Sequence, residues 1–146
     1  MSKVHKLLSN KGSTVWSLSP ENTVFEALLM MEEKGVGALA VVHNDELVGM
    51  ISERDYARKI ALQGKKSKET KVKEIMTSHV YYTYPEQDIE DCLVIMTERR
   101  FRHLPVMSQN KMIGMISVGD VVKEIINNQQ YKIKQLENYI AWEESY

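Results

Sequence analysis

The sequence predicts an α/β (α+β) fold in which two β-α-β-β-α repeats pack about a pseudo-two-fold axis and a C-terminal helix follows. The first observation is an internal repeat: residues 20–60 align on residues 85–125 without a gap, at an offset of 65 positions. The second is that apolar residues in both copies change from helical spacing to short runs separated by a polar turn. The composition, 43% hydrophobic and 27% charged, is that of a globular chain.

The first copy is expected to start with a short strand before Pro20 and to continue with a helix. Thr23 and Glu26 are spaced as in a capping box, and Gly35 indicates the end of the helix. Between them, apolar residues recur at positions i, i+3, i+4 and i+7: Val24, Ala27, Leu28 and Met31. The apolar runs 38–42 and 47–51 flank a polar turn and predict a β-hairpin. A second helix is expected over about 53–62.

The second copy repeats this order. The same helical spacing recurs at Ile89, Cys92, Leu93 and Met96. A hairpin is expected from runs 104–107 and 112–116, with a short strand before Pro85 and a second helix over about 118–127. Similar segments, VHKLL at 4–8 and VKEIM at 72–76, precede the two copies. We therefore expect one repeat over 3–70, a second over 71–128, and a helical extension over 129–146.

Charge and composition exclude several function classes. The net charge is −1, so the chain has no basic surplus for nucleic acid. A single cysteine, Cys92, cannot form an intramolecular disulfide. No apolar signal core or transmembrane run is found, which leads us to expect a cytoplasmic protein without membrane contact. The four histidines lack metal-ligand spacing, no phosphate-binding Gly-rich loop occurs, and we expect neither a metal site nor an enzyme.

The clearest repeated polar element is GMISERD at 49–55 and GMISVGD at 114–120, each at a predicted strand-to-helix junction. Free N–H groups at such a helix start favour a phosphate near Ser52 or Ser117. The carboxylates of Asp55 and Asp120 suit the paired hydroxyls of a ribose. The pattern Ser-x-x-Asp is equally that of a capping box, which requires no ligand. From the residues alone, nucleotide binding and helix capping both remain open.

The duplicated unit, the RHLPV segment at 102–106 and the two Gly-h-x-Ser-x-x-Asp stretches resemble a tandem CBS-domain pair, or Bateman module. The ending QQYKIKQLENYI is similar to that of small stand-alone bacterial and organellar CBS-pair proteins. The resemblance spans about residues 3–128. It implies a non-catalytic regulatory module that binds AMP, ADP, ATP, NAD(H) or S-adenosylmethionine between the repeats and modulates an effector protein. It also implies a homodimer.

The resemblance also assigns roles to residues. Asp55 and Asp120 would bind ribose, and Ser52 and Ser117 would lie near ribose or phosphate. Val36 and Phe101 would flank the adenine. Cationic phosphate ligands would be Arg102 and His103, with Arg54 nearby.

The two clefts are expected to differ chemically. Gly37 and Ala38 stand in the first copy where the second has Arg102 and His103, and Gly119 stands opposite Arg54. We therefore expect the clefts to differ in affinity or in the nucleotide they hold.

The C-terminal extension carries an apolar stripe. Ile126, Ile133 and Ile140 are seven residues apart, with Leu136 between them. Such a stripe requires a partner surface, and a second copy of the chain is the expected one. The rival hypothesis is a ligand-free dimerisation or docking scaffold in which both Ser-x-x-Asp elements are only caps.

Overall fold

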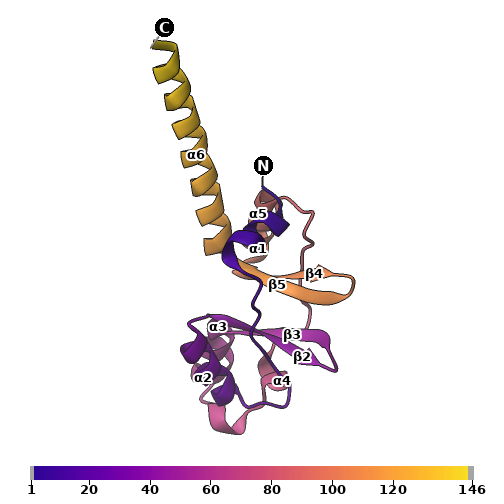
Figure 1. Cartoon of the computed structure of the whole chain (residues 1–146). Helices are drawn as coiled ribbons and strands as arrows, with labels where there is room; N and C mark the ends of the chain where they lie inside the picture. The colour runs from indigo at the N-terminus through magenta and orange to yellow at the C-terminus, as the bar shows by residue number, and fades with distance from the viewer. Residues whose placement is uncertain (1, 145–146) are drawn as a thin grey trace.

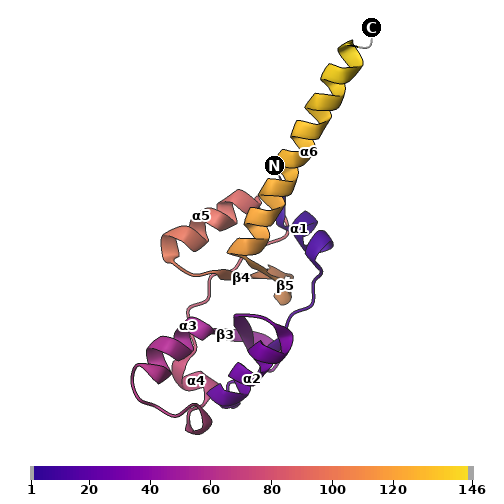
Figure 2. The ribbon, with the colours of Figure 1, turned by 90° about the vertical axis from the view of Figure 1, so that its left-hand side faces the viewer.

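The computed structural model describes residues 2–144 and confirms the predicted fold class. Two β-sheets lie face to face in the middle of the body, and helices cover their outer faces (Figure 1). The first sheet has the order β1-β2-β3 and the second consists of β4 and β5. After a quarter turn the same stacking is visible, with one repeat above the other (Figure 2).

The first repeat follows the predicted order of elements. Its strands are β1 (Ser17–Leu18), β2 (Ala38–His43) and β3 (Glu46–Ser52), with α2 (Val24–Lys34) between β1 and β2. The Thr23–Glu26 capping box begins α2, and Gly35 ends it with φ of 65°. The second predicted helix is one turn of α-helix, α3 (Glu53–Tyr56), followed by a π-helical turn, η1 (Ala57–Ala61). A 3₁₀ turn, η2 (Ser67–Glu69), leads to α4 (Val72–Ile75).

The second repeat contains α5 (Ile89–Arg99), β4 (His103–Ser108), β5 (Lys111–Ser117) and α6 (Val118–Glu144). Its predicted first strand is reduced to a single parallel bridge between Thr83 and Val106. Here α6 continues without a break into the extension, which gives one helix of 27 residues.

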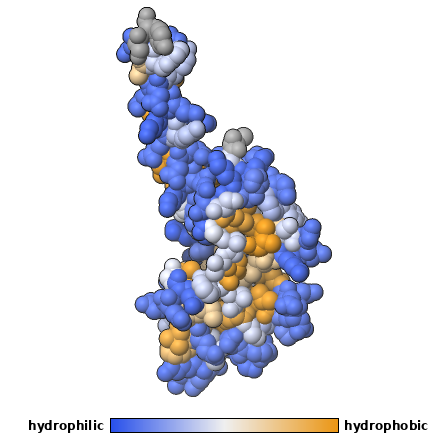
Figure 3. Space-filling model, viewed as in Figure 1, coloured by the Kyte–Doolittle hydropathy of each residue, from blue (hydrophilic) through white to orange (hydrophobic). Residues whose placement is uncertain are grey.

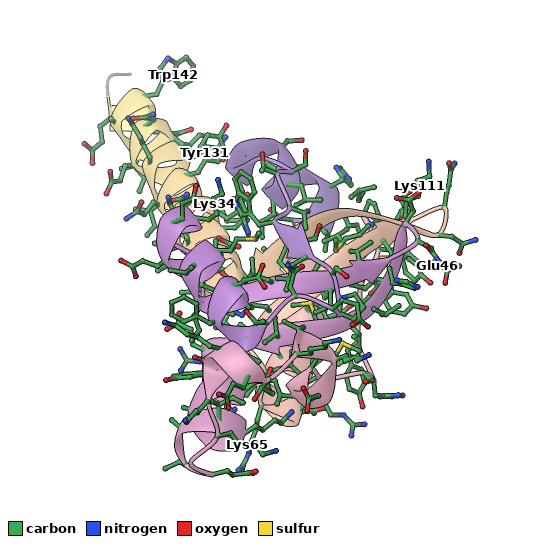
Figure 4. All side chains as sticks on the ribbon, turned by 90° about the horizontal axis from the view of Figure 1, so that it is seen from below. Lys34, Glu46, Lys65, Lys111, Tyr131 and Trp142 are labelled. Atoms are coloured by element: carbon green, nitrogen blue, oxygen red, sulfur yellow. The ribbon has the colours of Figure 1, made fainter. Side chains whose placement is uncertain are left out.

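Both hairpins turn through two residues with positive φ, Asn44 and Asp45 in the first and Gln109 and Asn110 in the second. Two successive positive φ values match the right-handed twist of the strands, which keeps both hairpins tight. Glu46 and Lys111, next to the two turns, lie at the same side of the molecule (Figure 4).

The helix that precedes each repeat packs into the core of the other repeat. The N-terminal helix α1 (Val4–Lys11) contributes Val4, Leu7 and Leu8 to the apolar core of the second repeat. In the same way α4 contributes Val72 and Ile75 to the core of the first. This exchange ties the two repeats together, because neither core is complete without a segment that lies before the other repeat.

Strand residues alternate between a core and the opposite sheet. Leu39 and Val41 belong to the first core, whereas Ala40, which is fully buried between them, belongs to neither core. Figure 3 shows apolar surface gathered across the middle of the body and a mostly hydrophilic α6.

Candidate functional site

A cleft of about 810 Å³ opens between the two repeats. It is formed by the start of β2, the junction of β3 with α3, the connection after α4, and the segment between α5 and β4. Six of the residues selected from the sequence line it: Ser52, Arg54, Asp55, Phe101, Arg102 and His103. Val36, Ser117 and Asp120 do not line this cleft.

Ser52 and Asp55 form a capping box at the wall of the cleft. The Ser52 amide donates to Asp55 Oδ2 at 3.0 Å, and the Asp55 amide donates to Ser52 Oγ at 3.2 Å. Only one carboxylate oxygen of Asp55 serves the cap. The other, Oδ1, lies 3.2 Å from Lys59 Nζ in an ion pair whose lysine is part of the cleft. Asp55 can therefore cap the helix through one oxygen and line the cleft at the same time.

Positive charge dominates the cleft. Its Arg and Lys side chains are six: Arg54, Arg58, Lys59, Arg99, Arg100 and Arg102. Its carboxylates are two, Glu53 and Asp55. This surplus stands out in a chain with a net charge of −1, and it favours an anionic ligand.

Arg54 bridges the two repeats across the cleft. Its Nη1 donates to the carbonyl oxygen of Arg100 at 2.8 Å. Arg100 ends α5 with φ of 59°, in the position that Gly35 occupies in the first repeat. The guanidinium of Arg54 therefore reaches the turn that leads to Phe101 and Arg102, so both repeats contribute to one cationic wall.

Aromatic rings form a second wall. Phe101 and Tyr81 stack with ring centroids 5.5 Å apart and an angle of 17° between their planes. Arg99 lies over the Tyr81 ring at 5.4 Å, and His79 meets the edge of that ring. Val36, the counterpart of Phe101, does not line the cleft, although each of the two packs against the core of its own repeat.

His103, the first residue of β4, lines the cleft, and its imidazole lies near Gly37 of the first repeat. Burial, reinforced by the charges of Lys11 and Arg102, lowers the pKa of His103 below its ordinary value of 6.5, although Asp120 acts in the opposite direction. The imidazole is consequently neutral at pH 7. It can donate or accept a hydrogen bond there, but it adds no charge to the cleft.

The second copy of the Ser-x-x-Asp element, Ser117 and Asp120, has different neighbours. Ser117 and Asp120 form the equivalent capping box, with the Ser117 amide 2.8 Å from Asp120 Oδ2. Lys11 from α1 also reaches this oxygen, at 2.5 Å. Burial raises the pKa of the Asp120 carboxyl, but the hydrogen bonds from Lys11 and Ser117 outweigh burial and lower the pKa overall. Both aspartates therefore have a lysine partner, but Lys59 of Asp55 lies four residues further along the same segment, whereas Lys11 of Asp120 comes from the distant helix α1 and contacts the capping oxygen itself.

Lys11 takes the place of a backbone contact present in the first repeat. There, Met50 and Thr77 exchange two backbone hydrogen bonds of 3.0 and 2.8 Å. In the second repeat the corresponding carbonyl, that of Met115, accepts from Lys11 Nζ at 2.5 Å.

Comparison with known proteins identifies the family. The CBS domain model matches residues 13–62 and 72–127. The chain belongs to the CBS-domain family. It is 41% identical over 137 residues to the mitochondrial CBS domain-containing protein CBSX3 of Arabidopsis thaliana. This alignment covers 90% of this chain and 66% of the relative.

Solved CBS structures share the fold. A CBS-domain protein from Burkholderia ambifaria MC40-6 superimposes with a TM-score of 0.84 and 45% identity, covering 88% of this chain and 96% of that one. The CBS domain pair of MJ0100, solved in complex with 5′-methylthioadenosine and S-adenosyl-L-methionine, has a TM-score of 0.78 and 20% identity over 88% of this chain and 98% of its own. At that identity the likeness to MJ0100 concerns the fold.

Sequence reasoning missed part of the cleft. Arg99 and Arg100 precede Phe101 in a run, ERRFRH, that holds three arginines in six residues and could have indicated a cationic loop. Tyr81 and His79 lie in the connection after α4, which no motif marks. Within residues 2–144, no three His, Cys, Asp or Glu side chains gather as metal ligands, and no helix is long and apolar enough to cross a bilayer.

Proposed function

We propose that this CBS pair is a non-catalytic regulatory module that binds an adenosine-containing anion in the open cleft and thereby modulates an effector protein. The ligand class is AMP, ADP, ATP or NAD(H). The observation that carries the proposal is one cleft that combines a carboxylate acceptor, a cationic wall and an aromatic wall. These three elements match the ribose, phosphate and adenine of a nucleotide.

Each part of the nucleotide has a proposed partner. Asp55 accepts hydrogen bonds from the ribose hydroxyls, with Ser52 beside it. The phosphates lie against Arg54 and Arg102, and the adenine rests on Phe101. His103, neutral at pH 7, lines the cleft as a hydrogen-bonding group.

A second, weaker site is proposed at Ser117 and Asp120. Lys11 competes there with the ribose, because it already holds the Asp120 oxygen that accepts from the Ser117 amide. The two sites should consequently differ in affinity.

The signal is proposed to arise because the cleft is built from both repeats. A ligand that contacts Asp55 on one repeat and Arg102 on the other favours the arrangement of repeats in which both contacts are made. A coupling free energy of about 1–3 kcal/mol between the cleft and an effector surface would suffice for regulation. We further propose that the protein acts as a homodimer in the cytoplasm.

The rival function, a scaffold without ligand, is favoured by one observation: both Ser-x-x-Asp elements do form capping boxes. Thermal unfolding with AMP, ADP, ATP, NAD, NADH and S-adenosylmethionine separates the two functions. A ligand at 100 times its dissociation constant adds about 2.7 kcal/mol to the free energy of unfolding, which corresponds to a rise in Tm of roughly 5–10 °C.

Asp55→Asn supplies the decisive variant, and Asp120→Asn is its matched control. Both substitutions weaken a capping box of the same geometry, but only Asp55 lines the open cleft. We expect Asp55→Asn to abolish most of the ligand-induced rise in Tm and Asp120→Asn to retain it. A flat response of the wild-type chain to all six compounds would support the scaffold instead.

A further inference from the structure

The C-terminal half of α6 stands away from the body without any covering surface. Figures 1 and 2 show it rising beyond both repeats in two perpendicular views. Every residue from 129 to 144 is exposed. At 1.5 Å per residue, this segment is about 24 Å long. Most helical stability in proteins comes from the packing of an apolar face, and the body does not supply that packing for residues 129–144.

One side of α6 carries a heptad pattern. From residue 122 onward its a positions are all isoleucine, and its d positions are Val122, Gln129, Leu136 and Glu143. The a positions are Ile126, Ile133 and Ile140. We call the apolar members of these two sets the seam: Val122, Ile126, Ile133, Leu136 and Ile140. Their exposed fractions run from 40% at Val122 to 60% at Leu136.

The body of the protein does not cover the seam. The side of α6 that faces the body is marked by Val121, which is fully buried, and by Ile125, which packs against the second core. The first seam residues, Val122 and Ile126, each follow one of these body-facing residues by one position, so they lie on a neighbouring side of the helix. The seam continues along α6 past the end of the body. Tyr131 and Trp142 mark the two ends of the projecting part (Figure 4).

The residue types select the partner and its orientation. In parallel coiled coils, isoleucine at a with leucine at d favours two strands, and here the a positions from 126 onward are isoleucine and one d position, Leu136, is leucine. In a parallel pair, the g residue Lys132 lies opposite the e residue Glu137 of the other helix, twice by symmetry. An antiparallel pair places g against g and e against e. The g residues Ile125, Lys132 and Tyr139 then offer no acidic partner, whereas among the e residues Lys123 can face Glu137 or Glu144. The parallel arrangement is the one that gives Lys132, in the projecting part, an acidic partner.

We propose that α6 pairs with α6 of a second copy of this chain in a parallel two-stranded coiled coil along the seam. The two second repeats then lie side by side at the base of the coil. The proposal rests on the homodimer proposed above and specifies its contact. Nucleotide binding does not enter into it, so the oligomeric state is measured without nucleotide.

The first experiment is the mass of the full chain in solution by light scattering at micromolar concentration. The wild-type chain is expected at twice 16.9 kDa, and Ile133→Lys at 16.9 kDa. Tyr131→Lys is the matched control, because it places the same charge on the same exposed helix at an f position outside the seam. Ile133 is 55% exposed, so the body should stay folded, which circular dichroism checks.

Charge exchange gives a second measurement. Lys132→Glu should weaken the dimer about tenfold, because two attractive pairs become repulsive, and adding Glu137→Lys should restore it. Ile140→Cys then tests orientation: in a parallel pair the two thiols meet and form an interchain disulfide. The wild-type chain, whose Cys92 is buried, is the control.

Three outcomes would overturn the proposal. A monomeric wild-type chain contradicts both the homodimer and its contact. A dimer that survives Ile133→Lys supports a homodimer but refutes the α6 contact. A dimer that is lost in Ile133→Lys, yet neither cross-links through Ile140→Cys nor recovers with the charge exchange, refutes the parallel arrangement.

Discussion

Replacing Lys11 by Met tests whether Lys11 holds the carboxylate of Asp120. Methionine removes the charge of Lys11 and keeps an unbranched side chain. Lys11 Nζ lies 2.5 Å from Asp120 Oδ2 and also donates to the carbonyl of Met115. Both contacts are lost in the variant.

The magnitude follows from these two contacts. The side chains of Lys11 and Asp120 are 34% and 26% exposed, so their ion pair contributes at most about 1 kcal/mol. The carbonyl left without its donor adds about 1 kcal/mol. We expect Lys11→Met to lower the free energy of unfolding by about 2 kcal/mol in total, which corresponds to a fall in Tm of roughly 4–8 °C.

The loss should depend on pH in a defined direction. The pKa of Asp120 is lowered in the folded chain from 3.8, so the stability it contributes is present above pH 4 and is lost as the pH falls through the folded pKa. Urea unfolding at pH 7 and at progressively lower pH measures this. The difference between wild type and Lys11→Met should shrink below pH 3.8.

A double-mutant cycle with Asp120→Asn isolates the pair. If Lys11→Met lowers the free energy of unfolding by less than about 0.5 kcal/mol, or by the same amount at every pH, Lys11 does not hold the Asp120 carboxylate. The argument that Lys11 occupies this carboxylate would then fail.

Two further predictions concern packing and chemical reactivity. Gly49→Ala should lower the free energy of unfolding by about 1–3 kcal/mol, measured by urea unfolding, because the new Cβ would lie 2.6 Å from Met76 Sδ and 3.0 Å from the Thr77 carbonyl oxygen. Gly119→Ala is the control: its Cβ would meet nothing closer than 3.7 Å, so the change should be neutral or stabilising. Burial raises the pKa of the Cys92 thiol, so iodoacetamide should modify Cys92 at pH 7 far more slowly in the folded chain than in the chain unfolded by urea. Equal rates of modification would contradict the burial of Cys92.

Much of the fold follows from local sequence signals. The capping box at Thr23 and the stop at Gly35 predict the ends of α2, because each satisfies backbone groups within a few residues. The two hairpins follow from short apolar runs around a polar turn. The exchange of α1 and α4 between the cores does not follow from such signals, since it depends on which apolar faces meet in space.

The candidate site is only partly predictable for the same reason. Six cleft residues were found through the repeated Ser-x-x-Asp element and the segment at 101–103. Tyr81, His79 and Arg58 were not, because each reaches the cleft from an element without a motif. Whether these residues bind a nucleotide stays a prediction for the ligand experiments.

The sequence by itself determined that this protein is a duplicated α/β unit with helix caps, tight hairpins and an apolar stripe at its end, because these features depend on residues near one another in the chain. Only the tertiary structure decided that Asp55 borders an open cleft while Asp120 is held by Lys11. Those two aspartates stand in nearly identical motifs, and the lysine that separates their roles lies 109 positions away from Asp120. Contacts over such distances arise from packing, which no local pattern encodes.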